Sequence, residues 1–308
     1  MKGCLIINYP IENQIAAGNL ETLHPMWEAY LQECDEFTIL HPGKQDYSFV
    51  WTGLDGLNKN VVCKKSHRAT LQMAAKREDA DVYRALFPFS AWCVPDGKPL
   101  IYSVHCNRNL PENKSHTIKD NVVEWMHDHS MQRAAVTAAN SKYLKQVYGT
   151  KHVHYNFWMP GFTPNLGPRA HGGCVYVGRE DKFTHEWDAP NLPQLATIVS
   201  DIPHDQLPEL YQQHHVSVVP IMGGFTIIES LACGTPVVSA DYEWSSEIIK
   251  DGVNGFLFPR GDWEQMAKLV KEAETMDWDR ARVAKTVEHM TAQAHMDREI
   301  KFIKEALK

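Results

Sequence analysis

Short apolar runs recur along this chain, and they restrict its fold more than any other feature. In the first half they are Cys4 to Asn8, Phe37 to Leu40, Leu100 to Val104 and Ala134 to Ala139. In the second half they are Cys174 to Val177, Ala196 to Val199, Val216 to Val219 and Pro236 to Ser239. Each run is too short for a buried helix or a bilayer span, and continuous apolar runs of this length are typical of buried parallel strands.

Stretches with helical spacing follow several of these runs. They are Leu20 to Glu33, Ser141 to Tyr148, Leu207 to His214 and Thr226 to Cys233. The alternation of strand and helix predicts an α/β fold with doubly wound, Rossmann-like sheets. The chain has 308 residues, which favours two such domains, and the segment 156–173 is rich in proline and glycine. We expect domains at 1–157 and 174–290, a linker at 158–173, and a C-terminal helix at 291–308 that packs back on the first domain.

Composition and charge exclude several classes of protein. Hydrophobic residues make up 44% and charged residues 22%, so a disordered chain is excluded. The formal net charge of −7 argues against nucleic-acid binding by bulk charge. The opening residues contain no run long enough for a signal peptide, and we expect a cytoplasmic protein without a transmembrane segment. The oligomeric state is left open.

Cysteine and histidine patterns give no metal motif. The seven cysteines contain no CxxC pair, so neither a disulfide framework nor a zinc cluster is supported. His127 and His129 flank Asp128, but neighbouring residues of a helix point in different directions. We therefore interpret this segment as a solvated helix face.

The segment from Pro220 to Phe258 carries the densest chemical signal. A predicted strand ends at Pro220, Gly223 and Gly224 allow close approach of a ligand to the backbone, and a helix begins near Thr226. Free N–H groups and the positive dipole end of a helix favour a diphosphate. Glu229, one turn later, is a candidate acceptor for the two hydroxyls of a ribose.

The same segment resembles a known enzyme family. The run Ser230 to Val238 after Glu229, then Glu247 to Ile249, and then Asn254 to Phe256 match signature blocks of the glycosyltransferases of GT-B fold. The resemblance is to the retaining, nucleotide-sugar-dependent group (glycosyl transferases group 1, family 4-like), in a compact form. It implies an acceptor-side first domain, a donor-binding second domain, and a hexosyl- or pentosyltransferase that uses a nucleoside diphosphate sugar. A UDP-sugar is the expected class of donor, and the sugar and the nucleobase are left open.

The resemblance also implies roles for individual residues. Arg179 and Lys182 would stabilise the departing diphosphate, and His105, at the end of a predicted strand, would contact the transferred sugar. These three are the predicted catalytic residues. The predicted donor-binding residues are Gly18, Gly178, Gly223, Gly224, Phe225, Thr226 and Glu229. Neither a metal nor a cofactor is expected, because cations and a helix dipole replace a divalent ion in stabilising the leaving group.

Two departures from the family pattern leave alternatives open. Ile221 stands where retaining members usually have a glutamate, so retention is expected but inversion, with His105 as base, stays open. The donor domain is short, as in virus-encoded enzymes that glycosylate hydroxymethylated bases of DNA. The acceptor is a hydroxyl compound of unknown class: a glycan, a lipid, a small molecule or modified DNA. A catalytically silent GT-B protein that only binds nucleotide is a further alternative. An epimerase is disfavoured, because no paired acid and base is found.

Overall fold

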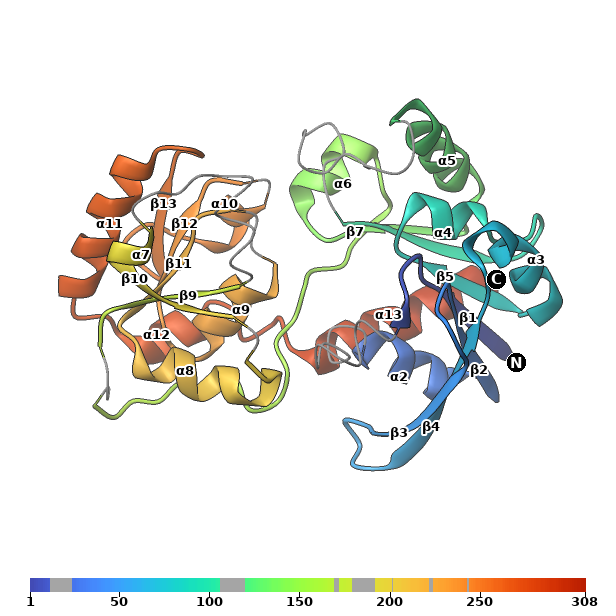
Figure 1. The fold of residues 1–308 in the computed structure, drawn as a ribbon, viewed down its shortest axis with the longest axis horizontal. Coiled ribbons are helices and arrows are strands. Elements are labelled where there is room, and N and C mark those ends of the chain that lie inside the picture. Colours follow the sequence, from blue (N-terminus) through green and yellow to red (C-terminus); the bar gives the residue numbers. More distant parts are fainter. Residues whose placement is uncertain are drawn as a thin grey trace. The chain divides into compact units, whose positions relative to one another are not determined.

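The computed structural model describes residues 1–11, 24–105, 120–168, 172–178, 192–200, 202–221, 224–242 and 244–308. The chain divides into two compact units (Figure 1). Unit 1 comprises Met1–Tyr155 and His295–Lys308, and unit 2 comprises Asn156–Ala294. Unit 1 is therefore discontinuous in sequence.

Unit 1 is built on an eight-stranded sheet, counted over the described residues, with the order β3-β4-β2-β1-β5-β6-β7-β8. The strands are β1 Lys2–Ile6, β2 Glu36–His41, β3 Tyr47–Thr52, β4 Asn58–Lys65, β5 Val82–Ala85, β6 Leu100–Val104, β7 Val136–Ala139 and β8 His152–Val153. All pairs of neighbours are parallel except β3 and β4, which form an antiparallel hairpin at one edge. Because the order steps outward from β1 in both directions, the connecting helices cover both faces.

Side-chain alternation along β1 divides the core of unit 1 into two layers. The helices are α2 His24–Glu33, α3 Leu71–Glu78, α4 Pro88–Trp92, α5 Asp120–Arg133, α6 Lys142–Tyr148 and α13 Ala292–Ala306. Leu5 packs with Trp27 of α2 and Phe302 of α13, which lie on one face. Cys4 packs with Leu71 of α3 on the other face, together with residues of α4 and α6. A strand buried on both sides explains the unbroken apolar run at the start of the sequence.

Unit 2 contains a five-stranded parallel sheet in the order β10-β9-β11-β12-β13, again for the described residues (Figure 1). Its strands are β9 Cys174–Val177, β10 Ala196–Val199, β11 Val216–Val219, β12 Val237–Ala240 and β13 Gly255–Phe258. Its helices are α7 Leu192–Leu195, α8 Leu207–Gln213, α9 Phe225–Ala232, α10 Ser245–Ile248, α11 Trp263–Thr275 and α12 Arg280–Lys285. Val218, Val238 and Met266 belong to the core between the sheet and α11.

Two glycines of unit 2 occupy positions that exclude a side chain. Gly234 follows the end of α9 with φ of 72°, a left-handed conformation that glycine adopts at helix ends without strain. At Gly255 an added Cβ would lie 1.9 Å from the carbonyl oxygen of Val237 on the paired strand. The backbone geometry therefore requires glycine at two positions of the signature blocks.

The predicted fold class is confirmed: both units are α/β with parallel sheets, and a helix ends the chain. The hairpin β3–β4 and strand β5 were not predicted. The interpretation of His127 as part of a solvated face was wrong, because its side chain is only 3% exposed and its Nδ1 lies 2.9 Å from the Tyr102 hydroxyl. Among the described helices, none is long and apolar enough to cross a membrane.

Candidate functional site

The N-terminus of α9 is the first candidate site, and it belongs to unit 2. β11 ends at Val219, and α9 begins at Phe225 after Gly224, which has no side chain to cap the helix. The first N–H groups of a helix have no partner within it. The backbone donors of Phe225 and Thr226 therefore suit an anionic ligand.

Phe225 also contributes to the local packing. Its ring lies edge-to-face on that of Phe157, with 5.1 Å between the centroids. Ile221, two residues beyond the end of β11, is a buried apolar residue. Both side chains therefore contribute to packing, and the backbone N–H of Phe225 is the group that suits an anionic ligand.

Glu229 lies one turn into α9 and is buried, with 2% of its surface exposed. Its Oε1 is 2.7 Å from Nε2 of His204, which precedes α8 in a 3₁₀ turn. No other hydrogen bond of this carboxylate is found in the described part of the chain. One carboxylate oxygen therefore keeps its capacity to accept hydrogen bonds from a ligand.

His204 was missed by the sequence reasoning, because a lone histidine beside Pro203 belongs to no recognisable motif. The structure brings it to Glu229 through the turn before α8, and the ring of Phe162 packs against it at 5.2 Å. Burial raises the pKa of Tyr211 well above its ordinary value, and the charge of Glu229 adds to this effect. The Glu229 carboxylate thus lies in poorly hydrated surroundings, with His204 as its hydrogen-bonding partner in the described part of the chain.

Of the remaining residues predicted for the donor site, Gly178 belongs to the described part of the chain. Gly178 follows β9, and its N–H donates to the carbonyl of Val199 at 3.1 Å, so this donor is used within the sheet. Gly18, Arg179, Lys182 and Gly223 lie outside the described residues. Their roles stay predictions.

A second group of polar side chains lies in unit 1, where three neighbouring strands end. β6, β7 and β8 pair in register, with Val104 opposite Ala139 and Ala139 opposite Val153. The next residues, His105, Asn140 and His154, therefore occupy adjacent positions at the carboxyl edge of the sheet. We call these three residues the strand-end row.

Several polar atoms of the strand-end row are buried without a hydrogen-bond partner. They are Nε2 of His105, Oδ1 of Asn140 and Nε2 of His154. Asn140 does donate through Nδ2 to the His105 carbonyl at 2.9 Å. Nε and Nη2 of Arg298, on α13, are also buried and unpartnered, and Arg298 interacts electrostatically with His154. Because buried polar atoms nearly always have partners, this cluster marks a place where water or a ligand supplies them.

The histidines of this region are neutral. Burial, with a smaller contribution from Arg84, lowers the pKa of His105 to about 3. Burial likewise lowers the pKa values of His154 and His295 well below the ordinary range. At neutral pH each ring therefore has one N–H donor and one acceptor nitrogen, which suits recognition of hydroxyl groups.

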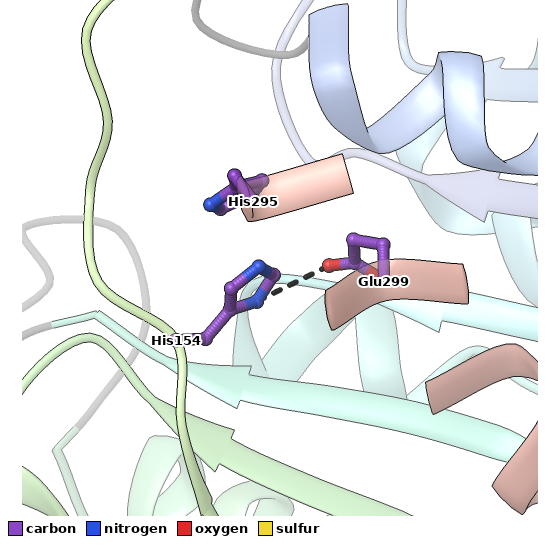
Figure 2. A group of neighbouring side chains, drawn as sticks. All are labelled: His154, His295 and Glu299. Atoms are coloured by element: carbon purple, nitrogen blue, oxygen red, sulfur yellow. Dashed lines mark ion pairs between the residues drawn. The ribbon is translucent and has the colours of Figure 1, made fainter. Parts of the chain in front are cut away.

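Helix α13 brings a buried glutamate to the same region (Figure 2). Glu299 is fully buried, and its carboxylate accepts hydrogen bonds from Arg84, with Nη2 at 2.7 Å and Nε at 3.0 Å from Oε1. Nδ1 of His154 lies 3.3 Å from the same oxygen. The His154 ring stacks on His295, with 3.7 Å between centroids.

His154, His295 and Glu299 have ligand atoms within 4.8 Å of one another, a spacing that could hold a metal ion. The surrounding charges disfavour a cation, because Arg84 already neutralises the carboxylate and Arg298 adds a second positive charge nearby. His295 also uses Nδ1 to donate to the Tyr155 carbonyl at 3.0 Å. We therefore interpret the group as a buried polar network that holds α13 to unit 1.

Known proteins resemble this chain in sequence and in structure. Residues 173–290 match the family model for glycosyl transferases group 1. D-inositol 3-phosphate glycosyltransferase of Streptosporangium roseum is 29% identical over 107 residues, which cover 34% of this chain and 24% of the relative. The chain thus matches only about a quarter of that curated protein.

Solved structures resemble the chain over its full length. Sucrose-phosphate synthase from Thermosynechococcus elongatus matches with a TM-score of 0.66 and 13% identity, covering 100% of this chain and 96% of that one. Anabaena HepE in complex with UDP and glucose matches with a TM-score of 0.62 and 17% identity, covering 99% and 97%. The lipopolysaccharide outer core galactosyltransferase WaaB matches with a TM-score of 0.65 and 13% identity, covering 100% and 99%. At these identities the likeness establishes the fold, which is GT-B.

Proposed function

We propose that this protein moves a sugar from a nucleoside diphosphate sugar to a hydroxyl acceptor, because residues 173–290 match the family model for glycosyl transferases group 1 and the chain has the GT-B fold. The match over 173–290 carries the proposal, since it contains the uncapped N-terminus of α9 and Glu229. The UDP bound to Anabaena HepE supports UDP as the nucleotide.

In this proposal unit 2 binds the donor. The N–H groups of Phe225 and Thr226 hold the diphosphate, and Glu229, positioned by His204, accepts hydrogen bonds from the ribose. Arg179 and Lys182 stabilise the charge that develops on the leaving diphosphate, and Gly178 and Gly223 contribute to donor binding. This arrangement provides cationic stabilisation of the leaving group without a divalent ion, and no cofactor takes part.

The acceptor hydroxyl binds at the strand-end row of unit 1 in the same proposal. His105 offers an unpartnered Nε2, and its low pKa keeps the ring neutral and able to accept a hydrogen bond. A ring with a pKa of about 3 is a weak base at neutral pH. This favours retention, in which the departing phosphate accepts the proton of the attacking hydroxyl and His105 orients the reactants.

The test of this function is calorimetric binding of UDP and UMP, followed by hydrolysis and transfer assays in EDTA. We expect UDP to bind much more tightly than UMP, because the predicted site is built for a diphosphate. Arg179→Ala should lower kcat by about 10²- to 10³-fold, with Arg179→Lys intermediate. Equal binding of the two nucleotides would contradict the diphosphate site, and activity lost in EDTA and restored by Mg²⁺ would contradict the metal-free mechanism. Nucleotide binding without hydrolysis or transfer would favour the silent alternative.

A further inference from the structure

A cavity of about 1120 Å³ lies in unit 1 where β2 and β4 end, away from the residues used above. Its lining comes from the ends of these two strands, from β3 and from α3. Ligands of parallel sheets bind outside the carboxyl ends of the strands, so the cavity has the usual place of a binding site. Its volume is comparable to that of pockets for organic molecules and far exceeds the needs of an inorganic ion.

The charged side chains of the cavity are mainly cationic. Lys44, Lys64, Lys65 and Arg77 line it, and Glu78 is the one carboxylate among the lining residues that the structure describes. Lys64 is neutralised, because its Nζ lies 2.8 Å from Oε1 of Glu78. Burial raises the pKa of Glu78, but hydrogen bonds from Lys64 and Lys2 outweigh this effect and leave it below its ordinary value. Glu78 is thus ionised and committed to these two lysines.

Two of the cations keep their charge uncompensated. Nζ of Lys65 donates to the carbonyl oxygen of Lys44 at 3.1 Å, which is a neutral partner. Arg77, exposed on α3, has no ion pair anywhere in the described residues. Two positive charges therefore face one cavity in a chain whose net charge is −7.

The rest of the lining suits an organic group. Leu40, Pro42, Met73 and Ala74 provide apolar surface, and Tyr47 adds an aromatic ring. A phosphate monoester has a charge near −2, which matches the two free cations, and arginine binds phosphate oxygens in a fork. A concave site of this size also suits a small molecule better than a polynucleotide, which would need an extended basic groove.

We propose that this cavity binds a small phosphate monoester, with the phosphate between Lys65 and Arg77 and the organic group against Met73 and Pro42. The site does not depend on the proposed transferase function, and its test measures binding alone.

The test is calorimetric titration with phenyl phosphate, with phenol and inorganic phosphate as partial probes. We expect phenyl phosphate to bind more tightly than either, because only this probe uses both the cations and the apolar surface. Arg77→Gln and Lys65→Gln should each weaken binding by about 10-fold or more, the usual cost of losing a hydrogen bond to a charged group. Lys76→Gln is the matched control: Lys76 adjoins Arg77 on α3, is exposed and does not line the cavity, so its loss should change affinity less than about twofold.

The location is checked by methyl NMR of methionine. Phenyl phosphate should shift the Met73 signal, which is assigned by its loss in Met73→Leu. The proposal is overturned if phenyl phosphate does not bind, if Arg77→Gln and Lys76→Gln bind it equally, or if Met73 does not respond. It is also overturned if a single-stranded oligothymidylate binds through Arg77 while phenyl phosphate does not, because the ligand would then be a polymer.

Discussion

Glu299 of unit 1 and Glu229 of unit 2 are both buried glutamates on helices, but their partners differ. Glu299 has the guanidinium of Arg84 on its carboxylate, with His154 beside it. Among the residues that the structure describes, Glu229 has one hydrogen bond, from His204. A buried carboxylate with a full set of partners stabilises a fold, whereas one with an unused oxygen can bind a ligand. The difference indicates a structural role for the first and supports the binding role that we propose for the second.

The largest effect is expected where the Glu299 network is broken. Arg84→Met leaves a buried carboxylate without its cation and should destabilise unit 1 by about 3 to 5 kcal/mol. Native-state hydrogen exchange of β1 amides measures the stability of unit 1 separately from that of unit 2. The double variant Arg84→Met/Glu299→Leu should recover much of the loss, since an apolar pair removes the unpaired charge. A single variant as stable as the wild type would contradict the structural role of this pair.

Glu229→Ala should affect binding more than folding. It removes the carboxylate proposed for the ribose, so calorimetry should show UDP binding weakened by about 1 to 3 kcal/mol. Exchange of β12 amides should report a smaller loss of stability than Arg84→Met causes in unit 1. Unchanged UDP affinity would contradict the binding role of Glu229.

The neutral histidines make unit 1 sensitive to acid. The folded-state pKa of His105, about 3, lies below the ordinary value of 6.5, so the unfolded chain binds a proton that the folded chain does not. The resulting stability is complete above pH 6.5 and is lost as the pH falls from there toward 3. The loss for one such histidine is about 1.4 kcal/mol per pH unit.

This pH dependence is measured by denaturant unfolding at pH 7, 6 and 5. His105→Gln should reduce the slope of unit 1 stability against pH by about one proton. His289→Gln, which changes an exposed histidine of unit 2, is the control and should leave the slope unchanged. An equal slope in wild type and His105→Gln would show that His105 titrates normally.

The smallest effect is expected at the N-termini of two helices, α6 and α9. Ser141 caps α6 in unit 1 by accepting a hydrogen bond from the Leu144 N–H at 3.0 Å, whereas α9 in unit 2 begins at Gly224 without a side-chain cap. Ser141→Ala should destabilise unit 1 by about 1 kcal/mol and leave UDP binding unchanged. Gly224→Ala should weaken UDP binding and leave the stability of unit 1 unchanged. Its added Cβ would lie 3.3 Å from Nδ2 of Asn156, beside the helix start that we propose for the diphosphate. Loss of UDP affinity in Ser141→Ala would contradict this separation.

The sequence predicted the elements whose local pattern is strong. The run Leu100 to Val104 coincides with β6, and Cys174 to Val177 coincides with β9, because strands buried on both faces require continuous apolar residues. The hairpin β3–β4 was missed because neither strand has a long apolar run. β4 has three apolar residues between asparagines and lysines, and β3, at the sheet edge, includes serine and threonine.

In the candidate site, too, some residues were predictable from a local pattern and others were not. The start of α9 and Glu229 were predicted because one contiguous segment encodes them. His204 reaches Glu229 from 25 residues away, and Glu299 reaches Arg84 from 215 residues away. Such pairs arise only from tertiary packing, and no local pattern in one sequence indicates them.

The return of α13 to unit 1 has a consequence for synthesis on the ribosome. Unit 2 is continuous, from Asn156 to Ala294, so all of it is translated before the last helix that unit 1 requires. At about 5 to 20 residues per second, Glu299 is added roughly 10 to 40 s after Arg84. During this interval the nascent first segment exposes the apolar face that Phe302 and Ile303 later cover. The first segment of unit 1, although it is made before unit 2, can therefore complete its fold only after unit 2 has been translated.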